Sequence, residues 1–435
     1  MMASGKTRAL LIDITPLQIS PAFRRVFIAR AVSLIGIGML LVSVPVQMWA
    51  LTGSSFQVGL ATAVTGTATF AGMLVGGMLA DRLDRRILIL TGRTAAALAF
   101  TGLALNAFGI FGGRPHVWIL YALAGFDGVI GALSAAALMA AVPTLIPRDK
   151  LAAVGALSSL TIRLGTAVAP ALAGVIIGAA GVCWTYTIAA IMASITVVIL
   201  LGLPSLPPHA PLADAAAHTT SEPADTPEIP ALGAFFRGAP IVLSVMVVGL
   251  LTMLGAGLVA LLPALVSDHF DGPGGAVGYL MAATAAGALI ATLTSGWIGG
   301  TPRPGAVLLT ATIAGFALIA TLGIATAFWI ALVLVLVIGY LDAVAEVIRY
   351  TLIQQHTPGP LLGRVNGIWM AQEVSGMTVG ALAAGAFGAH WAAPTAITYY
   401  GLALIGLGII AALGLASLRG VRGGTARTAE VVHTT

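Results

Sequence analysis

The loop at residues 76–86, with the sequence GGMLADRLDRR, decides how the rest of the chain is interpreted. It separates two apolar runs, at about 57–80 and 87–108. A helix needs about 20 mostly apolar residues to cross the hydrocarbon core of a bilayer, and both runs are that long. A short basic loop between two such runs is typical of a polytopic membrane protein.

The loop combines small, acidic and basic residues in a specific order. Gly77 allows the end of the first helix to approach a neighbour closely, and the Asp81 carboxylate can pair with basic groups or with a helix N-terminus. The positive charges that anchor the loop at one membrane face are Arg82, Arg85 and Arg86. A loop that only set the orientation of the helices would need these arginines, but not the glycine and the aspartate before them.

The composition of the whole chain also indicates a membrane protein. Hydrophobic residues make up 59% and charged residues 8% of the 435 residues, against about 45–50% and about 25% in soluble proteins. A soluble fold with so few charges would expose large apolar patches. The single cysteine, Cys183, excludes a disulfide framework, and the scattered basic residues favour membrane anchoring over a nucleic-acid surface.

Twelve apolar stretches of sufficient length follow one another along the chain. They are continuous and lack the ten-residue alternation of barrel strands, so we predict helices. The expected spans are 26–50, 57–80, 87–108, 117–142, 151–178, 182–203, 240–265, 276–298, 305–325, 328–350, 365–389 and 394–418.

The only long polar segment, residues 204–239, is rich in proline and poor in large apolar residues, which is typical of a linker. It divides the spans into six and six. We therefore predict an N-terminal segment (1–25), a first six-helix bundle (26–203), the linker (204–239), a second six-helix bundle (240–418) and a tail (419–435).

The distribution of Lys and Arg predicts the orientation of the helices. With the N-terminus inside the cell, fifteen basic residues fall on the cytoplasmic side and one, Arg114, falls in an outer loop. This bias obeys the positive-inside rule. We expect both termini and the linker to be cytoplasmic, and we expect the first helix to be retained, because no cleavable signal peptide is evident.

The two halves resemble each other at corresponding loops. Residues 77–85 parallel residues 296–303, and Pro147 before the fifth span corresponds to Pro358 before the eleventh. A duplicated six-helix unit is typical of transporters, whose substrate site lies near the membrane midplane between the halves.

The order of residues in the 76–86 loop resembles the signature of the major facilitator superfamily, Gly-x-Leu-x-Asp-Arg-x-Gly-Arg-Arg. Asp84 stands where that signature has glycine. The resemblance implies an all-α membrane fold of twelve helices in two pseudo-symmetric six-helix halves. It also implies that the loop is a conformational latch formed by Gly77, Asp81, Arg82, Arg85 and Arg86.

A second motif, RLGTAVAPALAG at residues 163–174, is similar to the exporter-associated pattern Gly-x-x-x-Gly-Pro-x-x-Gly-Gly. Ala169 and Ala173 replace two of its glycines. The residues expected to allow close helix packing are Gly165, Pro170 and Gly174. Ordinary packing of small residues is the alternative to an exporter-specific role.

The resemblance extends over the whole chain and is most specific in residues 1–90. The stretches SPAFRRVFIARAVSLIGIGMLLVSVPVQMWALTGSSFQVGL (20–60) and TPGPLLGRVNGIWMAQ (357–372) are similar to bacterial enterobactin exporters, the siderophore-exporting branch of the superfamily. This implies a multi-pass protein of the bacterial inner membrane that exports a siderophore, driven by the proton gradient as in antiporters of the family.

Several charged residues lie within the predicted spans, where an unpaired charge is costly and therefore suggests function. Asp127 and Arg163 both fall near the midplane, and an ion pair between them would either line the cavity or only brace the helices. Glu373 has no basic neighbour in its own helix. It is either a proton carrier or a hydrogen-bonded acid without a transport role.

The tenth span adds three more charges. Glu346 and Arg349 are three residues apart and are expected to pair locally, whereas Asp342 is freer to act. Arg30 and Arg93 lie close enough to the inner face to snorkel to it. The candidates for proton coupling are therefore Asp127, Glu373 and Asp342.

Arg163, Phe126 and Tyr340 are the candidates for contact with a substrate in the central cavity, although packing is the simpler role for any single aromatic residue. The sequence contains no phosphate-binding loop, metal-ligand spacing or catalytic triad. We therefore expect no cofactor, no metal and no enzymatic activity, and no ATP site within the chain.

The sequence thus predicts a siderophore exporter that uses proton antiport, with a small molecule, protons and the lipid bilayer as its partners and no nucleic acid. A multidrug antiporter of the same superfamily, with a drug-like substrate, is the alternative. A membrane scaffold or sensor is the alternative of another class, but it would not need midplane charges or a latch loop. The sequence predicts no oligomeric state.

Overall fold

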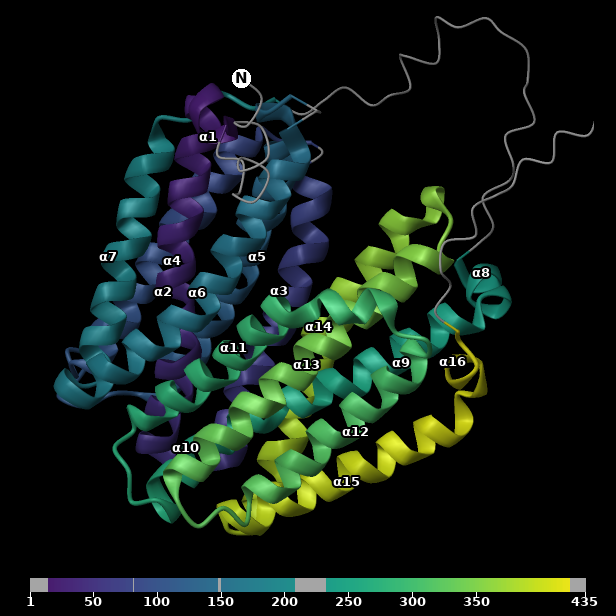
Figure 1. Cartoon of the computed structure of the whole chain (residues 1–435). Coiled ribbons are helices and arrows are strands. Elements are labelled where there is room, and N and C mark those ends of the chain that lie inside the picture. Colours follow the sequence, from purple (N-terminus) through teal and green to yellow (C-terminus); the bar gives the residue numbers. More distant parts are fainter. Residues whose placement is uncertain (1–14, 81, 148–149, 208–231, 423–435) are drawn as a thin grey trace, which may run out of the picture.

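The structure, a computed structural model, describes residues 15–80, 82–147, 150–207 and 232–422. All regular elements in these ranges are helices, and they form two bundles that follow each other along the chain (Figure 1). The first bundle contains α1 (Thr15–Ile19), α2 (Pro21–Thr52), α3 (Ser55–Ala80), α4 (Arg85–Ala107), α5 (Val117–Leu145), α6 (Leu151–Ala180) and α7 (Val182–Leu201).

The second bundle repeats this plan with more interruptions. Its α-helices are α8 (Leu232–Gly238), α9 (Pro240–Gly255), α10 (Leu262–Ala264), α11 (Ala276–Thr294), α12 (Pro304–Leu322), α13 (Phe328–His356), α14 (Gly359–His390), α15 (Ala393–Gly414) and α16 (Ala416–Arg419). Short 3₁₀ or π turns, η5 (Ala256–Ala260), η6 (Leu265–His269) and η7 (Ser295–Gly300), extend α9, α10 and α11.

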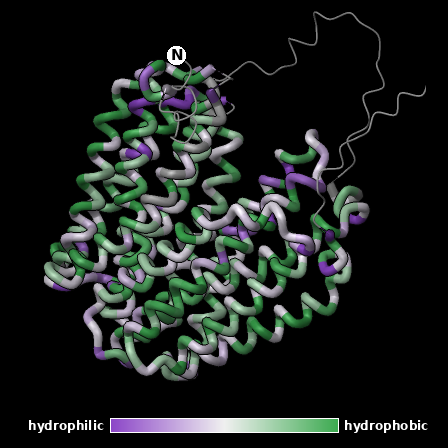
Figure 2. The backbone as a smooth tube through the Cα atoms, viewed as in Figure 1, coloured by the Kyte–Doolittle hydropathy of each residue, from purple (hydrophilic) through white to green (hydrophobic). Residues whose placement is uncertain are grey.

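Ten helices of the described chain are long and apolar enough to cross a membrane. Two further helices complete the set: α6, with an apolar stretch over Gly165–Ala180, and α14, which has 32 residues and would be about 48 Å long at 1.5 Å per residue. The predicted fold class, twelve helices in two six-helix halves, is therefore confirmed. Hydrophobic residues follow the helices along their length, and hydrophilic residues gather near the ends of the bundles (Figure 2).

The first span begins at Pro21 and not at the predicted residue 26. Ser20 caps the helix and accepts a hydrogen bond from the backbone N–H of Phe23 at 3.1 Å. The apolar run starts later than the helix because Arg24 and Arg25 lie in its first turns. A helix continues through such residues when they are at the membrane surface, so hydropathy alone places its start too late.

The seventh span is broken, whereas the sequence predicted one helix over 240–265. Regular α-helix ends at Gly255, a 3₁₀ turn follows, and the π turn η6 ends at His269. The predicted span is nevertheless confirmed, since Pro240–Ala260 is long and apolar enough to cross a membrane. The regular α-helix within it is shorter than predicted, because a change from α- to 3₁₀-type hydrogen bonding leaves the hydropathy of the run unchanged.

The two halves contact each other at one end of the molecule, which we name the far end. A Cβ atom added at Gly174 of α6 would lie 2.6 Å from the carbonyl oxygen of Gly275, just before α11, and one at Gly385 of α14 would lie 2.9 Å from the carbonyl oxygen of Ser55 in α3. Trp49 of α2 donates a hydrogen bond from Nε1 to Ser267 Oγ of the other half at 3.0 Å. Small residues thus allow backbones to touch across the halves.

The opposite end carries the arginines of the loops, and we name it the basic end. The bundles diverge toward this end (Figure 1). The helices that make the far-end contact are α3, α6, α11 and α14. Toward the basic end, several glycines of these helices and of η7 face open space, because a Cβ atom added to them would have no neighbour from outside its own stretch of helix within 4 Å. These glycines are Gly77, Gly155, Gly296, Gly363 and Gly367. The halves are therefore in contact at the far end and separated at the basic end.

The contact at Gly174 yields a first prediction. Gly174→Leu should weaken the far-end contact by about 1–3 kcal/mol, because no space exists for the side chain. Ser55, which is 2% exposed at the second far-end contact, against Gly385 of α14, can report the closure of this end as a cysteine in a Cys183→Ser background. We expect its maleimide labelling to become roughly tenfold faster, which corresponds to about 1.4 kcal/mol.

Gly178→Leu is the matched control on the same helix, because nothing lies within 4 Å of a Cβ atom there. It should leave the labelling rate unchanged. Equal rates in the parent and in Gly174→Leu would contradict the proposed role of this contact.

Candidate functional site

The latch loop is only partly described by the structure. Asp81 lies outside the described residues. The close approach that we expected of Gly77 is made by Gly76, where an added Cβ atom would lie 2.8 Å from Cα of Leu133 in α5. Gly77 faces open space, because consecutive residues of a helix point about 100° apart and only one of the two glycines can face α5.

The arginines of the loop lie at the start of α4 and around the end of α7. Arg82 is exposed. The backbone N–H of Arg85 donates to the carbonyl of Leu206 at 3.0 Å, and Arg86 Nη2 donates to the carbonyl of Leu201 at 3.0 Å. The loop after α3 is therefore tied to the segment after α7, a connection that the sequence did not predict.

Asp84 is the centre of this connection. Its carboxylate caps α4 by accepting the backbone N–H of Arg86 at 2.8 Å, and it also accepts the Ser205 hydroxyl at 2.5 Å and the backbone N–H of Leu206 at 3.0 Å. Aspartate before a basic helix start is a known capping signal, which the sequence analysis did not use. The residue that departs from the family signature thus anchors the start of the linker region.

These contacts also set the ionisation of Asp84, which lies outside the membrane-spanning segments. Desolvation opposes ionisation, but hydrogen bonds from Ser205, Leu206 and Arg86, with the charge of Arg86, together hold the pKa of Asp84 below its ordinary value of 3.8. A carboxyl whose pKa is depressed in the folded state stabilises that state fully above pH 3.8. This contribution is lost as the pH falls through the lowered folded pKa.

We therefore predict a pH-dependent release of the segment after α7, measured by pepsin cleavage next to Leu206 between pH 5 and pH 2. The wild type should resist cleavage at pH 5 and lose protection only below pH 3.8, whereas Asp84→Asn should be cleaved already at pH 5. Cleavage at the exposed Phe111 serves as the internal reference. Identical pH profiles for wild type and variant would contradict the role of Asp84.

The predicted ion pair between Asp127 and Arg163 is not described, because the side chain of Arg163 lies outside the described residues. A different cation, Arg93 of α4, acts electrostatically on Asp127 of α5. Arg93 is only 8% exposed and donates from Nη1 to the hydroxyl of Ser33 in α2 at 2.6 Å. The prediction that Arg93 extends to the membrane surface is wrong, because its side chain is buried in the bundle. Arg30, whose charge also acts on Arg93, is half-buried.

A cavity of about 380 Å³ lies between the halves. Phe70 of α3 lines it from the first half, and the second half contributes Met246, Val247, Leu250, Ile368, Ala371, Gln372 and Ser375. This volume is in the range of small-molecule sites. Phe126, which is exposed on α5, and Tyr340, whose hydroxyl accepts a hydrogen bond from Thr294 at 3.5 Å, lie outside this lining.

A buried polar cluster connects α13 and α14 in the second half. The guanidinium of Arg349, 2% exposed, lies over the ring of Trp369, with Cζ 4.8 Å from the ring centroid. Trp369 in turn donates its indole N–H to Glu373 Oε1 at 2.5 Å. The basic neighbour that Glu373 lacks in its own helix is therefore supplied by α13.

Three carboxylates act electrostatically on this cation: Glu346 and Asp342 of α13 and Glu373 of α14. The expected attraction between Glu346 and Arg349 therefore has a counterpart on the neighbouring helix, Glu373, which Trp369 joins to the cluster. The spacing of residues along α13 predicts only the first of these, since partners across helices depend on packing.

Gly249 of α9 makes room for the cluster. A Cβ atom added there would meet Nη1 of Arg349 and Nε2 of Gln372. Gln372 also lines the cavity, so Arg349 lies one side chain behind the cavity wall. Nothing in the sequence around Gly249 signals this role.

The helix-packing motif of α6 is divided between two neighbours. A Cβ atom added at Gly165 would lie 2.9 Å from Cβ of Leu34 in α2, within the same half. Gly174 and the carbonyl of Pro170 instead face Gly278 of α11 across the two halves. One short motif therefore contributes both to the first bundle and to the contact between bundles.

We predict that Arg349→Met lowers stability in detergent by about 3–5 kcal/mol, because it leaves carboxylates buried without their cation. Adding Glu373→Gln should recover part of this loss, as expected for groups that interact directly. Arg364→Met, at an exposed position of α14, is the control and should change stability by less than about 0.5 kcal/mol. Denaturant unfolding is measured for the wild type, Arg349→Met, Glu373→Gln, the double variant and the control, and simple additivity of the two changes would refute the coupling.

The comparison with known proteins agrees with this architecture. Residues 26–371 match the Major Facilitator Superfamily. The chain belongs to the major facilitator superfamily. It is 37% identical to the enterobactin exporter EntS of Shigella boydii serotype 18, covering 95% of this chain and 96% of the relative, and 36% identical to EntS of Citrobacter koseri, covering 93% and 94%.

Solved structures of transporters share the fold at low sequence identity. The nucleoside transporter NupG superposes with a TM-score of 0.69 at 13% identity, over 91% of this chain and 98% of NupG. A bacterial homologue of the iron transporter ferroportin, in an inward-facing state, superposes with a TM-score of 0.67 at 14% identity, over 92% of this chain and 99% of the homologue. The protein is thus a membrane transporter for a small molecule.

Proposed function

We propose that the protein exports a siderophore, a catecholate of the enterobactin type, from the cytoplasm across a bacterial inner membrane in exchange for protons. The observation that carries this proposal is the 36–37% identity to enterobactin exporters over nearly the whole chain. The aligned region includes the helices that line the central cavity. The proposal therefore extends to the substrate and is not limited to the fold.

The direction of transport rests on the orientation of the basic end. The positive-inside rule places this end, the termini and the linker in the cytoplasm. The described conformation, separated at the basic end and in contact at the far end, is then open to the cytoplasm. An exporter loads its substrate from this state, and the similarity to a transporter solved in an inward-facing state supports the assignment.

A catecholate is flat, polar at its edges and partly anionic. Phe70 supplies an aromatic face and Gln372 supplies hydrogen bonds in the cavity between the halves. Arg349, behind Gln372, supplies positive charge. Arg163, Phe126 and Tyr340 stay candidates for substrate contact in other conformations, when the halves rotate against each other.

Proton coupling is assigned to the intramembrane carboxylates Asp342, Glu373 and Asp127. If Asp342, Glu346 and Glu373 were all ionised, the cluster around Arg349 would carry a net charge of −2 (−3 + 1). Such a charge is costly inside a membrane, so the cluster favours states that hold protons. Proton binding and release there would shift the equilibrium between the conformation open to the cytoplasm and the one open to the opposite side. The latch residues Gly77, Asp81, Arg82, Arg85 and Arg86 would act on the same equilibrium.

Iron-starved cells that lack this protein should retain intact siderophore and secrete several-fold less of it. The wild-type gene should restore secretion, because export then follows the normal route. Glu373→Gln should restore it poorly if Glu373 carries protons, whereas Asp271→Asn, an acid outside the spans, is the control and should restore it fully. Intracellular and secreted siderophore are measured by chromatography and mass spectrometry.

Unchanged secretion by the deletion strain, together with increased sensitivity to unrelated drugs, would overturn siderophore export in favour of the multidrug antiporter. The apolar cavity residues Met246, Leu250 and Ile368 would suit such substrates. Unchanged secretion without drug sensitivity would argue against both and favour a scaffold or sensor.

A further inference from the structure

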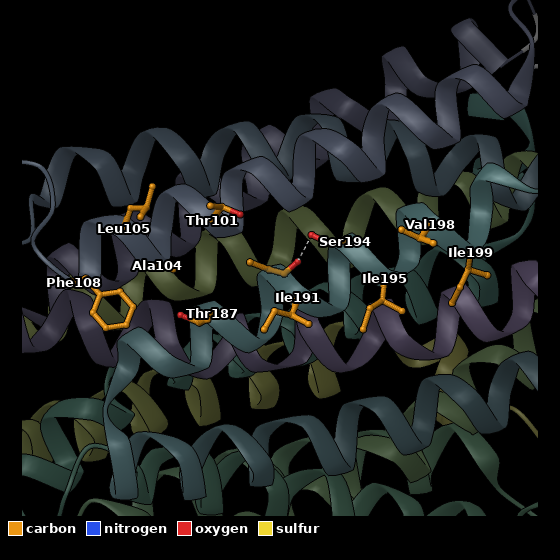
Figure 3. A pocket seen from close by; sticks show the side chains of 11 residues that line it. Thr101, Ala104, Leu105, Phe108, Thr187, Ile191, Ser194, Ile195, Val198 and Ile199 are labelled. Carbon is orange, nitrogen blue, oxygen red and sulfur yellow. Dashed lines mark hydrogen bonds between the residues drawn. The ribbon is translucent and has the colours of Figure 1, made fainter.

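A hollow of about 600 Å³ lies between α4 and α7 on the surface of the first half. Three hydroxyls line it, those of Thr101, Thr187 and Ser194, and each donates to a carbonyl of its own helix at 2.8–2.9 Å (Figure 3). The other lining side chains are apolar, so the hollow offers no free partner to a polar substrate. The buried charges of the first half lie elsewhere, among α2, α4 and α5.

Two of these charges are arginines that lie next to each other. Arg93 of α4 donates a hydrogen bond from Nη1 to the hydroxyl of Ser33 in α2 at 2.6 Å. Arg30 precedes Ser33 by three residues, and residues at this spacing are neighbours on the surface of a helix. Arg30 and Arg93 are therefore adjacent, and the charge of Arg30 acts on Arg93.

The positive charge of this pair exceeds the negative charge around it. In the part of the chain that the structure describes, Asp127 of α5 is the one carboxylate that acts on Arg93, and none acts on Arg30. Fully ionised, the three groups carry a net charge of +1 (+2 − 1). Arg30 is half-buried and makes no hydrogen bond to the described part of the chain. A cation in this position is costly inside a membrane unless an anion joins it.

The second half has the opposite balance of charge. Three carboxylates act on Arg349, so the charge of this arginine is already compensated. An anion that enters the space between the halves is therefore attracted to the first half more strongly than to the second.

The side chain of Arg30 is directed into the first half and not toward α7. Arg30 is one turn before both Ser33 and Leu34, which face different neighbours of α2: Ser33 is bonded to α4, and Leu34 lies against Gly165 of α6. The contact with α7 is made on another side of α2, at Gly36, where an added Cβ atom would lie 3.4 Å from a carbonyl oxygen of α7. Arg30 thus lies between α4 and α6, and α6 is one of the helices that contact the second half.

The pair of arginines lies near the depth of the cavity between the halves. Gly72 of α3 packs against Val129 of α5, because an added Cβ atom would lie 2.2 Å from the carbonyl oxygen of Val129. Phe70, which lines the cavity, and Asp127, which Arg93 acts on, each precede this contact by two residues. Since the halves are separated toward the basic end, a molecule in the cavity can approach these charges from that side.

We propose that Arg30, with Arg93 beside it, binds the anionic oxygens of the exported substrate. This inference rests on the proposed export of a catecholate and names the part of the first half that holds its polar edge. The planar guanidinium of Arg30 can donate two parallel hydrogen bonds, which suits two neighbouring oxygens on one ring. Arg93 adds positive charge while it remains bonded to Ser33, and Asp127 limits the attraction.

Isothermal titration calorimetry of the full-length protein in detergent tests the site with iron-free enterobactin and with its O-methylated analogue, which has the same rings but no acidic oxygens. Arg30→Gln should weaken the binding of enterobactin by roughly tenfold, the effect of a lost charge-assisted hydrogen bond, and leave that of the analogue unchanged. Arg30→Lys should restore part of the loss, because it keeps the charge but not the planar fork. Arg24→Gln, at an exposed position on the same helix, is the matched control and should bind both compounds like the wild type.

Asp127→Asn provides a second measurement with the opposite sign, which keeps the test decisive if Arg30→Gln folds poorly. It removes the negative charge beside the two guanidiniums and should therefore tighten the binding of enterobactin, but not that of the analogue. Binding by the wild type that neither Arg30→Gln nor Asp127→Asn alters would overturn this site and leave the proposed export intact. A wild type that binds neither compound would overturn the proposed substrate, and this site with it.

Discussion

The backbone contact between the two halves at the far end is the constraint on which the other features depend. Gly174 of α6 lies against the residues at the start of α11, and Gly385 of α14 lies against the start of α3. Because the glycines carry no side chains, the helices approach closely enough for van der Waals contact along their backbones. The same four helices separate toward the basic end, where the cavity between the halves opens. The closure at one end therefore defines the opening at the other.

The helices themselves follow from hydropathy and length, and the sequence predicts nearly all of them. What it did not predict was the continuation of α2 through Arg24 and Arg25 and the 3₁₀ and π turns of the seventh span after Gly255. A surface arginine lowers hydropathy without ending a helix. A change from α- to 3₁₀-type hydrogen bonding leaves hydropathy unchanged. Both differences come from local chemistry that an average over a window cannot resolve.

The candidate site was predictable by residue type but not by partner. Charged residues in apolar spans were identified from the sequence, because they are rare and costly there. Their neighbours lie on other helices: Ser33 for Arg93, and Trp369 and Glu373 for Arg349. Such pairs depend on how each helix is rotated and packed against its neighbours. The spacing of residues within one helix does not predict these contacts. Gly249 is the extreme case, since its role is only to leave space for side chains of two other helices.

The hydrogen bonds of Asp84 have a mechanical consequence for the connection between the halves. The chain leaves the first half after Leu206, which is held at the start of α4, and not at the end of α7 where the last span finishes. Any tension that arises in the connecting segment when the second half rotates is therefore applied to the beginning of α4 and to the arginines beside it. In a relative with glycine at this position, the bond from the Arg85 backbone N–H to Leu206 would be left to transmit this tension to α4. The Asp84 carboxylate adds the bonds from Ser205 and Leu206 and so strengthens the attachment of the tether to α4.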